Sequence, residues 1–344
     1  MACVVFNHAS APFIDHIGFV LPWHIGRFGV LLFFVHTSLV LMQSLERLER
    51  DEDITFKTLT FYVRRGLRIY PLAIAAVCIV VALHLPNELQ VSRTQVLRPA
   101  TFDLRTILAN ALLIQNLVAA PLVLYQLWTL PLELQMYLTL PWFFRQATRG
   151  VWRVVALLGV TATMAALGDH LFALPGLWRL NILPFVPCFL SGVLAYAILR
   201  RRPKPIVGAW AILGLLLGGL LLSAASNLGT GFHRWGWLPC VGVGASLPFI
   251  VDARDSWFTR AAEGVAKYSY GIYLLHTFAL YLAFQTGMGL PLALQWVIFT
   301  TSLCAMTWVA YHAIEAPFVR YGKAVRVQRW MPASITDGMA TSGD

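Results

Sequence analysis

The sequence predicts an all-α fold: a polytopic integral-membrane helical bundle of about ten transmembrane helices plus one re-entrant or interfacial segment. Hydrophobic residues make up 58% of the 344 residues and charged residues only 12%, whereas a soluble domain is about 25% charged. Apolar runs of about 20 residues, enough to span a bilayer, recur along nearly the whole chain. We therefore expect one membrane-embedded domain over 1–325 and a disordered cytoplasmic tail over 326–344.

The limits of the predicted spans follow the hydropathy of the chain. The first, 1–14, is short, because about 14 residues at 1.5 Å each cover only about 20 Å of a hydrocarbon core of about 30 Å. It either tilts into thinned membrane or begins upstream of Met1. The other predicted spans are 28–45, 68–84, 127–144, 154–170, 181–199, 206–224, 236–251, 268–285 and 291–313.

The basic residues predict the orientation of these spans. Most Lys and Arg residues fall in 46–68, 145–153, 200–204, 252–267 and 320–329. Because basic residues next to spans stay in the cytoplasm, these segments and both termini are predicted to be cytoplasmic. The alternation requires an even number of spans, so the apolar segment 106–124 is predicted to be re-entrant or to lie at the outer interface. This distribution also explains the net charge of +10 without a nucleic-acid partner.

The cysteines predict neither a disulfide framework nor a metal site. They are odd in number, lie far apart, and lack the short paired spacings that bind zinc. We expect them to be small buried hydrophobic residues. The five are Cys3, Cys78, Cys188, Cys240 and Cys304.

Two ionisable residues inside apolar spans are the first candidates for chemistry. Glu133 must find a hydrogen-bond donor or become protonated there, and Tyr137 lies four residues on, on the same helix face. His8 lies near the outer end of the first span, where a neighbouring helix or interfacial water could also satisfy it. An imidazole takes a proton from a hydroxyl near neutral pH, and a carboxylate fixes its tautomer. His8 and Glu133 thus have the chemistry of a base and its orienting partner.

Three arginines, Arg64, Arg65 and Arg68, stand at the predicted cytoplasmic start of the third span. They either anchor the helix at the inner face or, with the free N–H groups of the helix start, bind a phosphate-bearing ligand such as a nucleotide-like anion. Glu315 lies at the inner end of the last span. There it forms either an interfacial ion pair with Arg320 or part of a functional site.

Two more histidines fall inside predicted spans and are functional candidates for that reason. His36 lies in the second span and His276 in the span 268–285. Tyr270 and Tyr273 precede His276 by one or two turns and are expected to supply hydroxyl partners to it.

Six blocks of sequence occur in a fixed order along the chain. They are Phe6–Ala9, Arg27–Val35, Tyr62–Pro71, Leu127–Pro141, Ser269–His276 and Ile314–Phe318. Together they resemble the acyltransferase 3 family of integral-membrane acyltransferases, over a region that reaches to about Gly322. Each block alone is weak, but six in register are specific.

The resemblance implies transfer of an acyl group, commonly acetyl from acetyl-CoA at the cytoplasmic side of a bacterial inner membrane. The implied acceptor is a hydroxyl of an extracytoplasmic carbohydrate or glycolipid, reached among membrane lipids. By position, the resemblance implies that His8 is the catalytic histidine, Glu133 its acidic partner, and Arg65 and Arg68 part of the donor site.

The chain departs from the family pattern in three places. The arginine that begins the family's first helix would fall before Met1. His36-Thr37-Ser38 replaces the usual leucine-serine-glycine and would bring an imidazole to an apolar face. Thr129-Leu130-Pro131-Leu132 replaces the serine-rich sequence that leads into Glu133.

Two other classes of protein remain open from the residues. A transporter could use His8, His36, Glu133 and His276 as a proton relay coupled to solute movement. A flippase or polymerase-like subunit of envelope glycan assembly is a further alternative.

Overall fold

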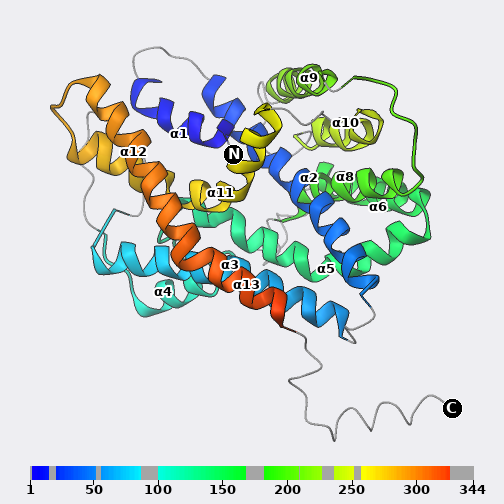
Figure 1. Ribbon diagram of the computed structural model, residues 1–344, viewed down its shortest axis with the longest axis horizontal. Helices are drawn as coiled ribbons and strands as arrows, with labels where there is room; N and C mark the ends of the chain where they lie inside the picture. The colour runs from blue at the N-terminus through cyan, green and yellow to red at the C-terminus, as the bar shows by residue number, and fades with distance from the viewer. Residues whose placement is uncertain are drawn as a thin grey trace, which may run out of the picture.

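The computed structural model describes residues 2–14, 21–51, 56–86, 100–167, 182–208, 210–226, 236–251 and 257–325 (Figure 1). These residues form a helical bundle whose only β-type pairing, within the described ranges, is an isolated bridge between Val207 and Ile250. The α-helices are α1 (Ala2–Ile14), α2 (Leu21–Glu49), α3 (Lys57–Ala82), α4 (Leu104–Ala111), α5 (Thr129–Arg149), α6 (Val151–Ala166), α8 (Val186–Leu199), α9 (Ala211–Ser226), α10 (Leu238–Ser246), α11 (Trp257–Leu280), α12 (Leu292–Ala310) and α13 (Ala316–Ala324).

Short 3-10 and π-helical segments extend several of these helices. The 3-10 segments are η1 (Tyr125–Trp128), η3 (Leu183–Phe185) and η4 (Leu247–Phe249), and the π-helical segments are η5 (Tyr281–Thr286) and η6 (Tyr311–Glu315). Because η6 joins α12 to α13 without a break, the last predicted span is part of one long helix, Leu292–Ala324.

Every predicted span overlaps a described helix, although the bounds differ, and the predicted number of about ten spans is not confirmed. Three helices in the described ranges are long and apolar enough to cross a membrane: His24–Glu49, Lys57–Ala82 and Leu292–Ala324. The apolar helices Val151–Ala166, Leu183–Leu199, Ala211–Leu222 and Leu238–Phe249 are shorter. The predicted tail 326–344 and the ends predicted at 168–170 and 181 lie outside the described residues.

The segment predicted not to cross, 106–124, contains only the eight-residue α4, about 12 Å long, followed by turns. Asp103 caps α4 by accepting a hydrogen bond from the Thr106 N–H at 3.0 Å. The Thr106 side chain and this N–H together lower the pKa of the Asp103 carboxyl group. Asn110 donates to the carbonyl oxygen of Pro121 at 2.8 Å and accepts from the Val123 N–H at 3.0 Å. Side chains thus satisfy backbone groups of an irregular segment packed against α3.

Helix α2 lies at the centre of the bundle and packs against α1, α3, α5, α8, α9 and α10 (Figure 1). Its contact with α8 is very close, because a Cβ atom at Gly192 would lie 2.0 Å from the Ser38 hydroxyl oxygen. Small residues let helix backbones approach in this way in membrane proteins.

The cysteines only partly match the prediction. All five are free thiols; Cys188 and Cys240 are buried, Cys3 is intermediate, and Cys78 and Cys304 are exposed. The prediction of burial is wrong for Cys78 and Cys304, because an apolar run does not reveal which face of a helix points toward its neighbours.

Candidate active site

Two histidines from distant parts of the chain form a direct pair between α1 and α11. His8 Nδ1 lies 2.9 Å from His276 Nε2, and the ring centroids are 5.0 Å apart. His276 is fully buried, whereas His8 is partly exposed and has the Tyr125 ring 5.9 Å from its own. A substrate can therefore reach the His8 imidazole, whereas the His276 imidazole lies behind it and is inaccessible.

The expected tyrosine hydroxyl partners of His276 are wrong. Its Nδ1 instead lies 2.7 Å from the Tyr273 carbonyl oxygen and 3.2 Å from that of Ile272. A histidine within a helix reaches the carbonyl groups of the preceding turn, whereas the longer tyrosine side chains reach other helices. Tyr270 donates to the Ile69 carbonyl at 2.7 Å, and Tyr273 donates to that of Gln126 at 3.0 Å.

Glu133 is buried in α5, and its hydrogen-bond partner is the Tyr137 hydroxyl group, which donates to it. It also interacts electrostatically with Arg65 and Arg68 of α3. The structure thus pairs Glu133 with Tyr137, with Arg65 and Arg68 within electrostatic range, rather than with His8. The expected direct contact between base and carboxylate is not formed in this structure, because residues 133 and 137 meet on one face of α5 while His8 meets α11.

The three arginines of α3 are held by three different partners. Arg64 donates to the carbonyl oxygens of Gly322 at 3.1 Å and Lys323 at 3.3 Å, which ties α3 to α13. Arg65 Nη2 donates to the hydroxyl oxygen of Ser44 on α2 at 3.4 Å. The third, Arg68, points to the last helix.

Arg68 Nη2 lies 3.5 Å from Glu315 Oε1. The alternative pairing of Glu315 with Arg320 is therefore wrong. Residues five apart do not share an α-helix face, and Glu315, the last residue of η6, is buried whereas Arg320 is exposed.

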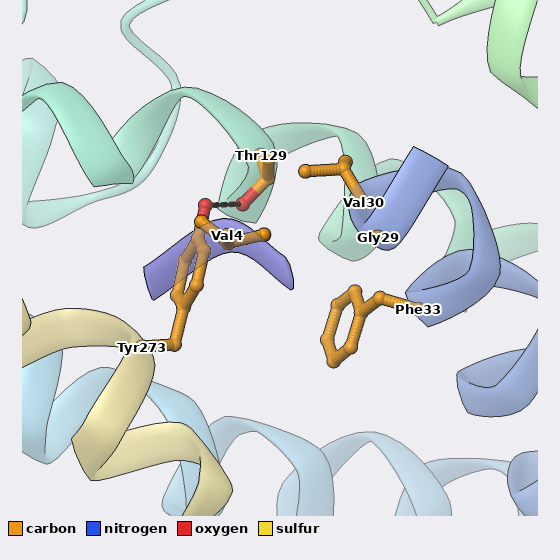
Figure 2. A pocket seen from close by; sticks show the side chains of 6 residues that line it. All are labelled: Val4, Gly29, Val30, Phe33, Thr129 and Tyr273. Atoms are coloured by element: carbon orange, nitrogen blue, oxygen red, sulfur yellow. Dashed lines mark hydrogen bonds between the residues drawn. The ribbon is translucent and has the colours of Figure 1, made fainter. Parts of the chain in front are cut away.

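Figure 2 shows a small cavity beside Tyr273, whose ring centroid lies 6.3 Å from that of His276. The cavity is partly open, has room for about one water molecule, and is lined by Val4, Gly29, Val30, Phe33, Thr129 and Tyr273. Val4 stands one turn before His8, and Tyr273 stands one turn before His276. The Tyr273 and Thr129 hydroxyl groups lie 2.7 Å apart and join α11 to α5 beside this cavity.

The positions of these residues connect the arginines to the histidines. Thr129 lies one turn before Glu133 on α5, and Tyr273 lies one turn after Tyr270 on α11. Tyr270 interacts electrostatically with both Glu133 and Glu315. From Tyr270 to His276 the α11 axis rises about 9 Å, so the arginine cluster and the histidine pair occupy successive levels of one bundle.

His36 does not join this site, because it lies on the exposed face of α2. The sequence did not single out Thr129 or Ser44 as site residues, and it indicated Tyr273 only as a partner of His276. The spacing of Tyr273 from His276, and of Thr129 from Glu133, was a usable signal. Nothing in the local sequence around Ser44 marks it as an arginine partner.

The fold is that of a helical membrane protein. A family model described as an acyltransferase domain, that of the acyltransferase 3 family, matches residues 1–314, and the chain belongs to this family. No curated protein and no solved structure matches the chain.

Proposed function

We propose that the protein is an O-acetyltransferase of the bacterial inner membrane that moves an acetyl group from cytoplasmic acetyl-CoA to a hydroxyl of an extracytoplasmic carbohydrate or glycolipid. The observation that carries this proposal is the His8–His276 pair, at 2.9 Å, beside a small cavity and one level away from an arginine cluster. A base, a space for a small group and a cationic site are the parts that this reaction requires.

The arginine cluster is the proposed site for the phosphates of the donor. The Arg68 side chain is 39% exposed, and Arg65 Nε has no hydrogen-bond partner within the described ranges. Guanidinium groups bind phosphate through paired N–H groups. Glu133, which interacts with Arg65 and Arg68, would orient both arginines for the donor rather than act on the histidine.

The histidine is the proposed base. As the acceptor oxygen attacks the thioester carbonyl carbon, its proton passes to the His8 imidazole. The C–S bond then breaks, and the CoA thiolate leaves with the proton returned by the His8 imidazolium. Only the acyl group crosses, so the phosphates of the carrier need not enter lipid. The same base also serves transfer through an acyl-enzyme.

The cavity supports acetyl as the transferred group. Its lining residues are mostly apolar, and it has room for only about one water molecule, so a small substituent needs less side-chain movement to enter it than a large one. A long acyl chain in the same place would overlap the Phe33 ring, which stacks on Tyr273 at a centroid distance of 6.4 Å.

The proton-relay alternative finds less support. A relay needs a continuous series of titratable groups, but within the described ranges Nδ1 of His276 ends on backbone carbonyl oxygens. His36, one of the four proposed relay residues, lies on an exposed face of α2.

The test is acetyl transfer from labelled acetyl-CoA to the glycans of inverted inner-membrane vesicles that contain the protein. We expect His8→Ala to lower kcat by about 10² to 10⁴, the usual contribution of a general base. We expect Glu133→Gln mainly to raise the KM for acetyl-CoA, because it removes a charge that orients two arginines. His36→Ala is the matched control and should leave transfer unchanged. Transfer that survives His8→Ala, or intact purified protein that does not bind acetyl-CoA, would contradict the proposal.

A further inference from the structure

We infer that His276 is a positioning residue that fixes the tautomer of His8 and makes Nε2 the basic nitrogen of that ring. The inference rests on the proposed acyl transfer for its catalytic meaning, but the pairing itself can be tested without activity. Its basis is the set of hydrogen-bond partners around the two imidazoles, taken one nitrogen at a time.

Nδ1 of His276 faces two backbone carbonyl groups. It lies 2.7 Å from the Tyr273 carbonyl oxygen and 3.2 Å from the Ile272 carbonyl oxygen. A carbonyl oxygen can only accept a hydrogen bond, so the nitrogen must be the donor. The proton of the His276 ring is therefore on Nδ1.

The surroundings of His276 decide its charge. The side chain is fully buried, and its polar partners in the described part of the chain are the two carbonyl groups and His8. An imidazolium buried without a carboxylate partner would carry a large desolvation cost. His276 is therefore neutral, and its Nε2 carries a lone pair.

The neutral state of His276 fixes which ring nitrogen of His8 carries the proton. Nδ1 of His8 lies 2.9 Å from Nε2 of His276, the atom with the lone pair, and this is a hydrogen-bond distance. Since Nε2 of His276 can only accept, Nδ1 of His8 donates. A neutral imidazole carries one ring proton, so Nε2 of His8 is left unprotonated.

The reaction follows from this arrangement. When Nε2 of His8 takes the proton of the acceptor hydroxyl, the positive charge strengthens the hydrogen bond from Nδ1 to His276. His276 cannot pass a proton onward, because its own N–H is directed to backbone carbonyl groups. The proton therefore stays on His8 until the leaving thiolate takes it. In protease triads a carboxylate orients the histidine base, and here a neutral imidazole has that role.

The kinetic test compares two substitutions at one position. Glutamine in His276→Gln retains a side-chain carbonyl that can accept from His8 Nδ1, whereas leucine in His276→Leu cannot. We expect His276→Leu to lower kcat by about 10² or more, since an orienting partner can contribute up to about 10⁴. The KM for acetyl-CoA should change by less than about threefold. The kcat of His276→Gln should be at least about tenfold higher than that of His276→Leu, because glutamine restores the hydrogen-bond acceptor.

Thr277→Val is the matched control for packing. Thr277 is the next residue of α11, is equally buried, and its hydroxyl group has no hydrogen-bond partner within the described ranges. We expect this variant to retain wild-type kcat. If His276→Leu and His276→Gln lose the same activity, or if Thr277→Val loses as much, the positioning role is wrong.

The second test reads the tautomer directly by ¹⁵N NMR of histidine-labelled protein in lipid nanodiscs, with His8→Ala to assign the signals. We expect His8 to carry its proton on Nδ1 in the wild type and to show a tautomer mixture in His276→Leu. A wild-type His8 protonated on Nε2 would overturn the inference even if the variants fail to fold. Wild-type protein that shows the expected tautomer but transfers no acetyl would instead contradict the proposed function.

Discussion

At the residue scale, the buried ionisable groups are arranged so that each has a partner from another turn or another helix. Glu133 accepts from Tyr137, and Glu315 lies 3.5 Å from Arg68. Both carboxylate oxygens of Glu315 are buried and make no hydrogen bond within the described ranges, so the charge of Arg68 is their principal compensation. Removing Arg68 would leave the buried Glu315 carboxylate without its cation, whereas removing Glu315 would leave a partly exposed arginine.

The residue-scale prediction concerns the size of the transferred group. Phe33→Ala enlarges the small cavity beside the histidine pair, so we expect the ratio of kcat/KM for butyryl-CoA to that for acetyl-CoA to rise. One methylene group in an apolar pocket contributes about 1–3 kcal/mol, which corresponds to a change of about tenfold or more. The measurement is transfer from the two labelled donors by the same preparation.

The neighbouring Phe34→Ala is the control, because Phe34 is fully buried on the same helix and does not line this cavity. It should destabilise the protein without changing the donor preference. An equal shift in both variants would mean that general loosening, and not the cavity, sets the preference.

At the scale of elements, close helix contacts set the geometry of the site. Helix α1 lies against α2 so closely that a Cβ atom at Gly29 would lie 2.6 Å from the Cys3 Cβ atom. Gly29 also lines the small cavity, so the approach of α1 to α2 fixes one of its walls. The position of His8 on α1 depends on the same contact.

The element-scale prediction uses the contact of α2 with α8. In Gly192→Ala the new Cβ would lie 2.1 Å from the Val35 carbonyl oxygen, so the two helices must move apart. We expect a loss of about 1–3 kcal/mol, the usual cost of overpacking, and a lower midpoint of thermal unfolding in detergent.

Gly159→Ala is the matched control on α6, where a Cβ would meet nothing within 4 Å. Alanine is the better helix former by about 1 kcal/mol, so this variant should unfold at the same or a higher temperature. Similar losses in both variants would show that the contact between α2 and α8 is not as close as described.

At the scale of the whole molecule, two of the basic segments lie at the same end of the bundle. The end of α2, the start of α3 and the end of α13 all lie at the lower edge of the bundle in Figure 1. Lys57 at the start of α3 donates to the Glu49 carbonyl at the end of α2, and Arg64 donates to the Gly322 carbonyl of α13. This common basic end is where the positive-inside rule places the cytoplasm.

The whole-molecule prediction is that the two ends of the bundle differ in accessibility. In a background with Cys3, Cys78 and Cys304 changed to serine, Met288→Cys should react with an impermeant maleimide in intact spheroplasts. Lys204→Cys should react only after permeabilisation. Both positions are exposed, so the membrane and not burial decides the result. Labelling of Lys204→Cys from outside would contradict the orientation.

The sequence by itself determined the helical class, the approximate positions of the helices and the candidate residues for chemistry. These depend on local hydropathy and on the cost of placing ionisable groups in lipid, and both are properties of short segments. Local sequence was enough to identify five of the candidates, His8, Glu133, Arg65, Arg68 and His276.

Only the tertiary structure decided which of these residues meet. His8 and His276 are 268 positions apart, and Arg68 and Glu315 are 247 apart. Such pairings depend on which face each helix turns toward its neighbours and on how closely the helices pack. Hydropathy alone could not specify these faces, because lipid-facing and buried positions of a membrane helix are equally apolar. Cys78 and His36 both lie in apolar segments, and only the structure shows that both are exposed.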